Sequence, residues 1–516
     1  MSAPNCLRCL VRPSAGIPSS TAAPRTAAVQ TPFLPRSAPF STTAANARPK
    51  NQPHRPDASK IVHTRAGKRL QLGKFKKDRV AEKGRAPAPG ERKAYRKRIT
   101  LSNDNAIPVP WLSDLSPTGL ADPANTAKVL ALPEDVQDQL RASEAFKPSQ
   151  CWGMFRKPAV LVRKETVDLT SRMEASVDKK QTLRLAITGD KVAGKSMMLL
   201  QAMTHAFLNN WIVIHVPEGM GPPALFPCYH TSVSMLTEPP FAVQELTTAC
   251  TEYAPVPGSE PAQYMQPVYV LKLIQAIKRA NEKVLAKTYT ISAHPELPQN
   301  IPANTPLLAL ANVAKEADAA WPVFQALWSE LTAQGANRPP ILFSIDGLAH
   351  AMKVSDYRSP AFDLIHAHDL SLLRLFADAM GGGVQFPAGG AVLAATSRSN
   401  APRAPSMELA LAQREAEQAA RLAGAGAGSG SKGAVPQRDP FFRGYDDRVE
   451  AVLRSVQVLR LGGIDKLEAR ALMEYWAASG MLRATVDEKT VAEKWTLAGS
   501  GVLGEMERAA LLTARV

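Results

Sequence analysis

One octapeptide, GDKVAGKS at residues 189–196, limits the fold more than any other part of the sequence. It matches the pattern G-x-x-x-x-G-K-[ST], in which glycines let successive backbone N–H groups turn toward phosphates. In this pattern the lysine, here Lys195, reaches the β and γ phosphates, and the hydroxyl of Ser196 ligates Mg²⁺. Alternating apolar residues at 183–187 precede the loop and a helical apolar face follows it, so the sequence predicts a strand, a phosphate loop and a helix.

Four further short apolar runs alternate with helical stretches. They are WIVIHVP (211–217), PPILFSIDG (339–347), GGAVLAATS (389–397) and SVQVLRL (455–461). This alternation predicts an α/β fold of the P-loop NTPase class, similar to AAA+ and STAND proteins, with a parallel sheet wrapped by helices. Ligands of such sheets bind at the carboxyl ends of the strands, so we expect the nucleotide there.

The expected site combines the loop with two later strand ends. The expected nucleotide-binding residues are Gly189, Asp190, Lys191, Val192, Ala193, Gly194, Lys195, Ser196, Met197 and Thr396. Thr396 ends the fourth strand, where a polar side chain can sense the γ-phosphate. The expected metal ligands are Ser196 and Asp346, because ILFSID (341–346) has the form of a strand that ends in an acid able to hold Mg²⁺ through water. The alternative for Asp346 is a helix N-cap at a strand-to-helix turn.

The residue after Asp346 bears on catalysis. Motor ATPases usually place a second acid there as the base for the attacking water, whereas this chain has Gly347. Without a base the water is poorly activated, so we expect nucleotide binding with slow or absent hydrolysis and no catalytic residue. No [NT]-K-x-D sequence, the guanine reader of signalling GTPases, occurs in the chain, so no motif identifies the base.

The basic charge is confined to the first hundred residues. Residues 1–100 hold 22 Lys and Arg against 4 Asp and Glu, a formal charge of +18, while the rest of the chain carries −2. Residues 1–45 lack acids and mix Arg with Ser, Thr, Ala and Pro, as mitochondrial transit peptides do; a merely disordered tail is the alternative. Residues 46–100 are expected to be a disordered basic extension that binds the sugar-phosphate backbone of RNA and does not read its bases. A solvated linker is the alternative.

The remaining residues divide into three expected parts. Residues 101–180 form an N-terminal adaptor segment, residues 181–461 form the nucleotide-binding domain, and residues 462–516 form a small C-terminal helical lid. The domain carries a helical insertion at 221–335 and a flexible insertion at 400–438. The apolar face expected for the lid is Ile464, Leu467, Ala471, Leu472, Tyr475 and Trp476. No apolar run reaches the length of a membrane-spanning helix.

Taken together and in order, these segments resemble one family. The residues that carry the resemblance are FRKPAVLVRK (155–164), GDKVAGKS (189–196), WIVIHVPEG (211–219), ILFSIDGLAHAM (341–352), GGAVLAATS (389–397) and DPFFRGYDD (439–447). They are similar to the death-associated-protein-three family, the GTP-binding proteins of the mitochondrial small ribosomal subunit, in a fungal form. Ala193 stands where many relatives have glycine or another small residue, which the loop tolerates if its dihedral angles there are ordinary.

The resemblance implies a structural constituent of the mitochondrial small ribosomal subunit in the matrix, which supports mitochondrial translation. It implies bound GTP or GDP, rather than ATP, with Mg²⁺. Its implied partners are mitochondrial rRNA and other small-subunit proteins, and bridge contacts to the large subunit are a further expectation. The alternative is a free P-loop NTPase switch whose hydrolysis is stimulated by a partner that supplies the missing base.

Overall fold

Five parallel strands form the central sheet of this protein, whose structure is a computed structural model. It describes residues 64–65, 68–69, 99–147, 149–218, 243–248, 251–335, 337–398, 401–424 and 435–512. The strands, in spatial order, are β13 (Gln457–Leu461), β5 (Thr182–Gly189), β12 (Gly390–Ala395), β9 (Ile341–Asp346) and β6 (Ile212–Val216). Four of them lie within the apolar runs predicted as strands, and β5 contains the alternating residues 183–187, so the predicted parallel α/β sheet is confirmed.

The register of the sheet aligns the two predicted phosphate-site strands. Ala395 at the end of β12 pairs with Ile187 of β5 on one side and with Asp346 of β9 on the other. The carboxyl ends of β5 and β9 therefore lie at the same edge of the sheet, although β12 separates them. This places the loop at 189–196 and the acid at 346 on one edge.

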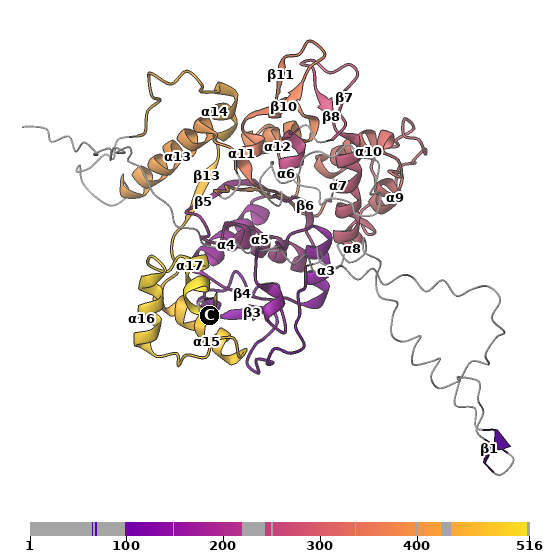
Figure 1. The fold of residues 1–516 in the computed structure, drawn as a ribbon. Coiled ribbons are helices and arrows are strands. Elements are labelled where there is room, and N and C mark those ends of the chain that lie inside the picture. The colour runs from indigo at the N-terminus through magenta and orange to yellow at the C-terminus, as the bar shows by residue number, and fades with distance from the viewer. Residues whose placement is uncertain are drawn as a thin grey trace, which may run out of the picture. The chain divides into compact units, whose positions relative to one another are not determined.

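Helices cover both faces of the sheet, because successive strand residues alternate between two apolar cores (Figure 1). Leu185 and Ile187 face the core formed with α3 (Glu134–Ala142), α4 (Lys164–Asp178) and α5 (Lys195–Leu208). On the opposite face the strands pack against three other helices and their connections. These are α7 (Pro267–Ala280), α10 (Ala317–Thr332) and α12 (Ser371–Gly381).

The described part of the predicted helical insertion, residues 221–335, is mainly helical. Its elements are α6 (Val243–Thr247), β7 (Ala254–Pro255), β8 (Tyr264–Met265), α7, α8 (Glu282–Leu285), α9 (Leu307–Asn312) and α10. Asn281, between α7 and α8, pairs with the edge strand β6: its side-chain amide accepts from Val213 N at 2.8 Å and donates to Val213 O at 2.9 Å. One side chain thus satisfies a backbone donor and acceptor that the end of the sheet would leave open.

Beyond α10 the chain adds further elements between the strands β9, β12 and β13. They are α11 (Leu348–Ala351), β10 (Val354–Arg358), β11 (Leu364–His366), η5 (Ala367–Asp369), α13 (Pro405–Gly424) and α14 (Asp447–Leu453). The expectation of a flexible insertion over 400–438 needs correction for residues 405–424, which form the helix α13. Met407, Ala410 and Leu411 follow helical spacing and are buried in the core, which explains why this stretch is ordered.

The C-terminal helices share a third apolar core with part of the adaptor segment. They are α15 (Lys466–Ala478), α16 (Glu488–Leu497), α17 (Leu503–Glu507) and the π-helical turn η6 (Arg508–Leu512). The antiparallel pair β3 (Val129–Ala131) and β4 (Ala159–Leu161) packs with them, and the short turns η2 (Pro123–Asn125) and η3 (Trp152–Met154) complete the adaptor. We call residues 462–512 the lid.

The prediction that Leu467 belongs to the buried apolar face of the lid is wrong. Leu467 is 74% exposed, whereas its neighbour Glu468 is 2% exposed. Glu468 is buried because its carboxylate accepts hydrogen bonds from the backbone N–H groups of Asp465, at the start of α15, and of Lys164, at the start of α4. A buried polar contact between two helix starts has therefore displaced the apolar face by one position.

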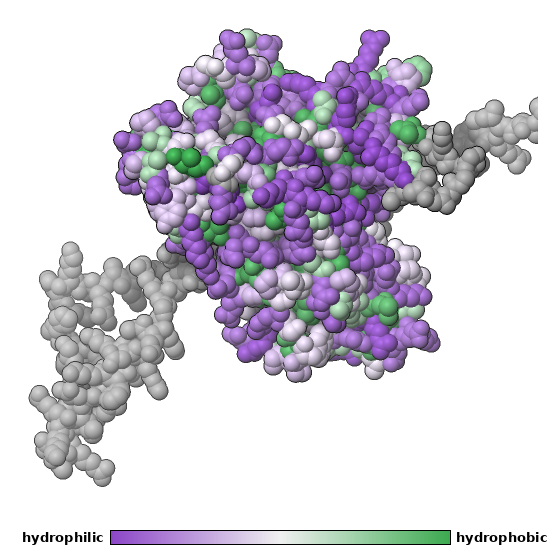
Figure 2. Space-filling view, turned by 180° about the vertical axis from the view of Figure 1, so that it is seen from behind, coloured by the Kyte–Doolittle hydropathy of each residue, from purple (hydrophilic) through white to green (hydrophobic). Residues whose placement is uncertain are grey.

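Residues 1–86 form a unit of their own, in which the structure describes only β1 (Thr64–Arg65) and β2 (Lys68–Arg69), an antiparallel pair. The predicted transit peptide, and the basic extension apart from these four residues and residues 99–100, lie outside the described residues. In the described part of the chain, no helix is both long and apolar enough to cross a bilayer. On the face shown in Figure 2, hydrophilic residues predominate and apolar residues form small separate groups.

Candidate nucleotide site

The loop between β5 and α5 has a backbone that only particular residues can adopt. Gly189 has φ +145°, and a Cβ there would lie 2.6 Å from the carbonyl oxygen of Leu461 in β13. Gly194, with φ +98°, is the N-cap of α5. Val192 has φ +55°, which is rare for a β-branched residue and is typical of functional loops. The two glycines of the motif are thus required by sterics, as the pattern predicts.

Ala193 lies at a position of the loop whose backbone conformation does not require glycine. It is 2% exposed and is not among the residues with positive φ. The condition set for it from the sequence, ordinary dihedral angles, is therefore met. The left-handed turn of the loop is made one residue earlier, at Val192.

Lys195 crosses the mouth of the loop. Its ammonium donates to the carbonyl oxygens of Gly189 at 3.0 Å and Asp190 at 2.6 Å. Burial lowers the pKa of Lys195, and the Arg398 guanidinium adds to the lowering, although nearby carboxylates oppose it. A partly desolvated ammonium that donates to neutral carbonyl groups is well placed to gain by contact with an anion.

Ser196 and Asp346 both contact the side-chain ammonium of Lys147. The ammonium of Lys147, from the adaptor segment, lies 2.9 Å from Ser196 Oγ, 2.6 Å from Asp346 Oδ2 and 2.6 Å from Glu218 Oε2. The side chains of Lys147, Glu218 and Asp346 are 18%, 10% and 5% exposed. The two residues predicted to bind a metal are therefore brought together, with an acid and a lysine that were not predicted.

Charge in this group is not fully balanced. Burial by itself would lower the pKa of Lys147, but the carboxylates of Asp346 and Glu218 outweigh it and raise the pKa above its usual value. Two carboxylates face one ammonium, and Glu218 Oε1 is buried with no hydrogen-bond partner among the described residues. Thr188 Oγ1, just before the loop, is likewise buried and unpartnered there. Such groups are usually satisfied by water or a ligand.

Slow or absent hydrolysis was expected because no second acid follows Asp346 in the sequence, but Glu218 places an acid nearby. Gly347 does follow Asp346, and a Cβ built on it would lie 3.4 Å from Glu218 Cγ. The carboxylate of Glu218, two residues after β6, thus lies beside the position at which motor ATPases carry their second acid. The chain has a second acid at the site, supplied by the neighbouring strand, and one of its oxygens is held by Lys147.

The other predicted residues lie around the loop with less direct roles. Thr396 N and Oγ1 both donate to Ile187 O, at 3.0 and 3.2 Å, so this hydroxyl supports the end of β5. Asp190 and Lys191 are exposed, and Asp190 lies 3.5 Å from the guanidinium of Arg398. Met197 packs partly against the core of α5. None of these four side chains contacts the group formed by Lys147, Ser196, Glu218 and Asp346 in the hydrogen bonds and ion pairs of the described residues.

The lid contacts the phosphate loop directly. Gly504 N, in α17, donates to Val192 O at 3.0 Å, and a Cβ on Gly504 would lie 2.6 Å from Val192 Cβ. Arg163, 4% exposed, donates to Ala193 O at 3.1 Å and to Gly462 O at 3.0 Å. Loop and lid are therefore joined by one backbone hydrogen bond and one buried guanidinium.

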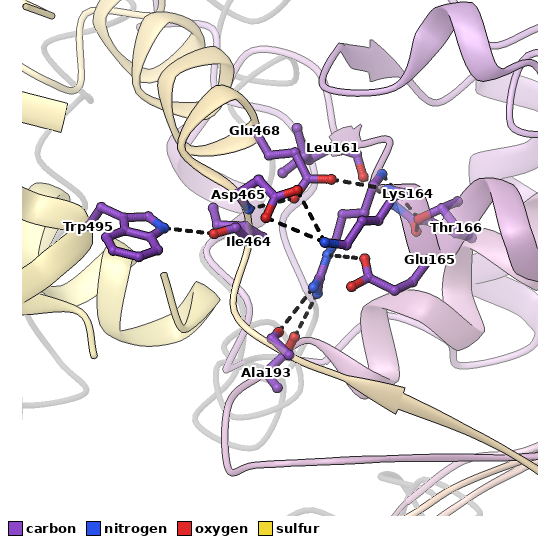
Figure 3. A network of polar contacts seen from close by, with 12 residues as sticks. Leu161, Lys164, Glu165, Thr166, Ala193, Ile464, Asp465, Glu468 and Trp495 are labelled. Carbon is purple, nitrogen blue, oxygen red and sulfur yellow. Dashed lines mark hydrogen bonds and ion pairs between the residues drawn. The ribbon is translucent and has the colours of Figure 1, made fainter. Parts of the chain in front are cut away.

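A second set of contacts fixes the lid next to this guanidinium (Figure 3). Lys164 Nζ lies 3.1 Å from Asp465 Oδ2, and Lys164 N donates to Glu468 Oε1 at 3.0 Å. Trp495 Nε1, from α16, donates to Ile464 O at 2.7 Å. Arg163 is paired with Glu165 at 3.2 Å. Short contacts, exposed or partly buried, therefore hold the lid beside Arg163, which itself bonds to the loop at Ala193 O.

The residues fit a phosphate group with a divalent cation better than a metal held by protein alone. The first N–H groups of α5 have no carbonyl partner within the helix, as at every helix start, and they face the loop. In the described ranges, no group of three or more His, Cys, Asp or Glu side chains is arranged to hold a metal ion. A magnesium ion at Ser196 and Asp346 would thus need phosphate and water oxygens to complete its shell.

Sequence reasoning missed Lys147, Arg163 and Glu218. Glu218 could have been found, because it is the first acid after the predicted strand at 211–217 and therefore lies at the ligand-binding edge. Lys147 and Arg163 carry no such signal: Lys147 is 49 residues from Ser196, and Arg163 is 299 residues from Gly462.

Comparisons with known proteins agree on one family. A family model described as mitochondrial ribosomal death-associated protein 3 matches residues 160–221 and 241–509. The small ribosomal subunit protein mS29 of Neurospora crassa is 54% identical over 514 residues, which cover 99% of each chain. The matched ranges of the family model include the phosphate loop, Glu218, Asp346 and most of the lid, but they do not include Lys147.

Proposed function

Because this chain belongs to the mitochondrial ribosomal death-associated protein 3 family, we propose that it is a structural protein of the mitochondrial small ribosomal subunit that retains a guanine nucleotide. Its place is the mitochondrial ribosome, in the matrix. In this role the nucleotide holds parts of the fold together, the particle supplies rRNA and protein partners, and the protein supports translation. The same assembly would include any bridge contacts to the large subunit.

One observation carries the nucleotide part of the proposal: the glycine loop and Asp346 lie at one edge of the sheet, with Lys195 and Ser196 opening α5. Backbone N–H groups of residues 189–196 would hold the phosphates, with the Lys195 ammonium on their charge. Ser196 and Asp346 would orient Mg²⁺, which supplies positive charge that neutralises phosphate oxygens. The preference for guanine rests on the family resemblance.

The lid contacts support a structural role for this nucleotide. Val192 and Ala193 of the loop are bonded to Gly504 and Arg163, so ordering the loop also orders the lid. A ligand that binds only the folded state stabilises it by about 2.7 kcal/mol when its concentration is 100 times its Kd. A nucleotide at this loop would therefore stabilise the junction between the sheet and the lid.

Glu218 is the observation that favours the second candidate, a free NTPase switch with partner-stimulated hydrolysis. A carboxylate beside Gly347 could orient an attacking water. Its Oε2, however, accepts from the Lys147 ammonium, and Oε1 is buried. While this pair persists the carboxylate is not available to water, so we keep slow or absent hydrolysis as the expectation.

The basic extension at 46–100 supplies the proposed contact with rRNA. Its charge density would release counterions from RNA phosphates, and no acidic substrate is needed to explain it. The nearly neutral remainder of the chain has no comparable excess. RNA attachment and nucleotide binding would thus be carried by different parts of the chain.

The experiment that tests this function measures binding and turnover on the same purified chain. We expect GDP and GTP to bind more tightly than ATP, and Lys195→Ala to weaken GDP binding about tenfold or more, because it removes a charge-assisted contact to phosphate. Lys283→Ala is the matched control, because the Lys283 side chain is 69% exposed and its ammonium pairs with Asp135 on the surface. Robust multiple-turnover hydrolysis abolished by Lys195→Ala would contradict the structural role and support the switch.

A further inference from the structure

We propose that Lys147 is an intramolecular competitor of the divalent cation: its ammonium occupies the position between Ser196 and Asp346, and a metal ion must displace it. The inference rests on the proposed nucleotide site, but concerns a residue outside the matched family ranges. Lys147 would then determine how strongly nucleotide binding at this site depends on the metal ion.

The geometry makes the two cations mutually exclusive. An ammonium has three N–H donors, and Lys147 has three oxygen neighbours at 2.6 to 2.9 Å, one each on Ser196, Asp346 and Glu218. No donor remains for a phosphate oxygen. A metal ligated by the same Ser196 and Asp346 oxygens would lie about 2.0 to 2.1 Å from any direct ligand, so the ammonium cannot keep its place beside it.

The lysine is positioned by its own short segment. Phe146 and Trp152 are each 5% exposed and pack edge-to-face with ring centroids 5.2 Å apart. Gln150 Oε1 accepts from Lys147 N at 2.9 Å and from Trp152 Nε1 at 2.6 Å. The backbone at Lys147 is thus anchored on both sides, and its side chain is aimed at the site. A lysine on an exposed, unanchored segment would not compete effectively with a metal ion.

When no metal is present, Lys147 neutralises negative charge at the site. Asp346 and Glu218 are both nearly buried, and two close carboxylates without a cation repel each other. Lys147 compensates them and keeps the sheet edge intact. When a metal ion takes Asp346 and Ser196, Lys147 can retain Glu218, the partner outside the predicted metal set. The adaptor segment then responds to metal occupancy through a single side chain.

The test measures metal binding without nucleotide. Mn²⁺ is titrated into the full-length protein and free Mn²⁺ is followed by electron paramagnetic resonance. We expect Lys147→Met, which keeps the aliphatic stem but removes the charge, to bind Mn²⁺ about tenfold or more tightly than the wild type. Lys147→Arg keeps a cation and should bind as weakly as the wild type. Lys283→Met removes a surface ammonium and is the control for loss of one positive charge.

A second measurement uses the nucleotide. The affinity for GDP is compared in Mg²⁺ and in a chelator, and the ratio of the two affinities should be larger for Lys147→Met than for the wild type. The reason is that the variant gains a better metal site but leaves two uncompensated carboxylates near the phosphates when metal is absent. The ratio should be unchanged in Lys283→Met.

Several outcomes separate the two proposals. Superimposable Mn²⁺ titrations of folded wild type and Lys147→Met overturn the competition, even if GDP binds both. If no nucleotide binds the wild type under any metal condition, the proposed function fails, while the Mn²⁺ comparison still decides the competition. If Lys147→Met does not fold without metal, added Mg²⁺ should recover its circular dichroism; no recovery, together with wild-type Mn²⁺ affinity in Lys147→Gln, also overturns it.

Discussion

The backbone N–H of Gly504 donates to the carbonyl oxygen of Val192 at 3.0 Å, which joins the C-terminal lid to the phosphate loop. The contact is close because Gly504 has no side chain: a Cβ there would lie 2.6 Å from Val192 Cβ. Val192 itself has a left-handed conformation, with φ +55°. The loop proposed to bind phosphate is therefore also held by the lid.

Gly504→Ala should separate lid and loop. The new methyl group forces α17 away from Val192, which we expect to lower the free energy of unfolding by about 1–3 kcal/mol, despite the better helix propensity of alanine. Release of a fluorescent GDP should also become faster, as measured by stopped flow. Gly462→Ala is the control, because a Cβ at Gly462 meets no atom within 4 Å. Identical GDP release from both variants would show that the lid does not support the loop.

Arg163 should stabilise the junction more than a surface arginine. Arg163→Met removes the hydrogen bonds to Ala193 O and Gly462 O and leaves the largely buried Glu165 unpaired. We expect the free energy of unfolding to fall by about 3 kcal/mol in urea denaturation. The free energy of unfolding of Arg163→Lys should lie between those of the wild type and Arg163→Met, because one ammonium cannot reproduce the geometry of the guanidinium fork.

The control for Arg163 is Arg470→Met, which removes an exposed pair with Glu474 one helical turn away. Surface pairs of this kind contribute little, so its unfolding curve should overlay that of the wild type. Equal losses in the Arg163 and Arg470 variants would mean that the buried guanidinium is not a structural link.

Stability should fall as the pH is lowered from about 6.5 toward 4. Burial lowers the pKa of His205, on α5, to about 4, and Glu174 at 3.8 Å does not offset this. Below the unfolded pKa of about 6.5 the unfolded chain binds a proton that the folded chain does not. The free energy of unfolding therefore decreases, by up to about 1 kcal/mol per pH unit from this residue.

His205→Gln checks this assignment through the slope and not through the absolute stability. Urea denaturation between pH 4.5 and 8 should give a shallower decrease below pH 6.5 in the variant and parallel behaviour of both proteins above pH 7.5. An unchanged slope in the acid range would assign the acid sensitivity to other groups, such as His350 or His368, whose pKa values are also lowered by burial.

Deleting residues 60–98 should weaken binding to RNA and make it less salt dependent. This segment holds 15 Lys and Arg against 3 Asp and Glu, and each phosphate contact contributes a slope of about −0.7 in log K against log salt for single strands. Filter binding at several salt concentrations gives both quantities. An unchanged slope and affinity would remove the RNA role from this segment.

The parts of the fold that could be predicted are those set by local pattern. β5, β9 and the phosphate loop follow from short apolar runs, glycines and an acid at fixed spacing, and each acts within a few residues. That Gly189 and Asp346 lie at one edge follows from the general behaviour of parallel sheets, whose carboxyl ends meet there. The spatial order of the strands, β13-β5-β12-β9-β6, was not predicted, because it depends on pairing between distant segments.

The parts that could not be predicted depend on contacts between distant segments. Lys147 reaches Ser196 and Glu218 across 49 and 71 residues, and nothing in its own neighbourhood marks it as a site residue. Glu468 is buried in place of Leu467 because Lys164, 304 residues away, donates to it. Tertiary hydrogen bonds overrode local polarity at both places, and they lie at the borders between the sheet, the adaptor segment and the lid.

We propose that a guanine nucleotide is kept in the mitochondrial small subunit as a structural component. The most direct test is to purify small ribosomal subunits from mitochondria, release bound nucleotide with acid, and identify and quantify it by mass spectrometry. We expect about one GDP or GTP per copy of this chain, and we expect Lys195→Ala to lose both the nucleotide and its incorporation into the subunit. Translationally active subunits that contain this chain and no nucleotide would contradict it.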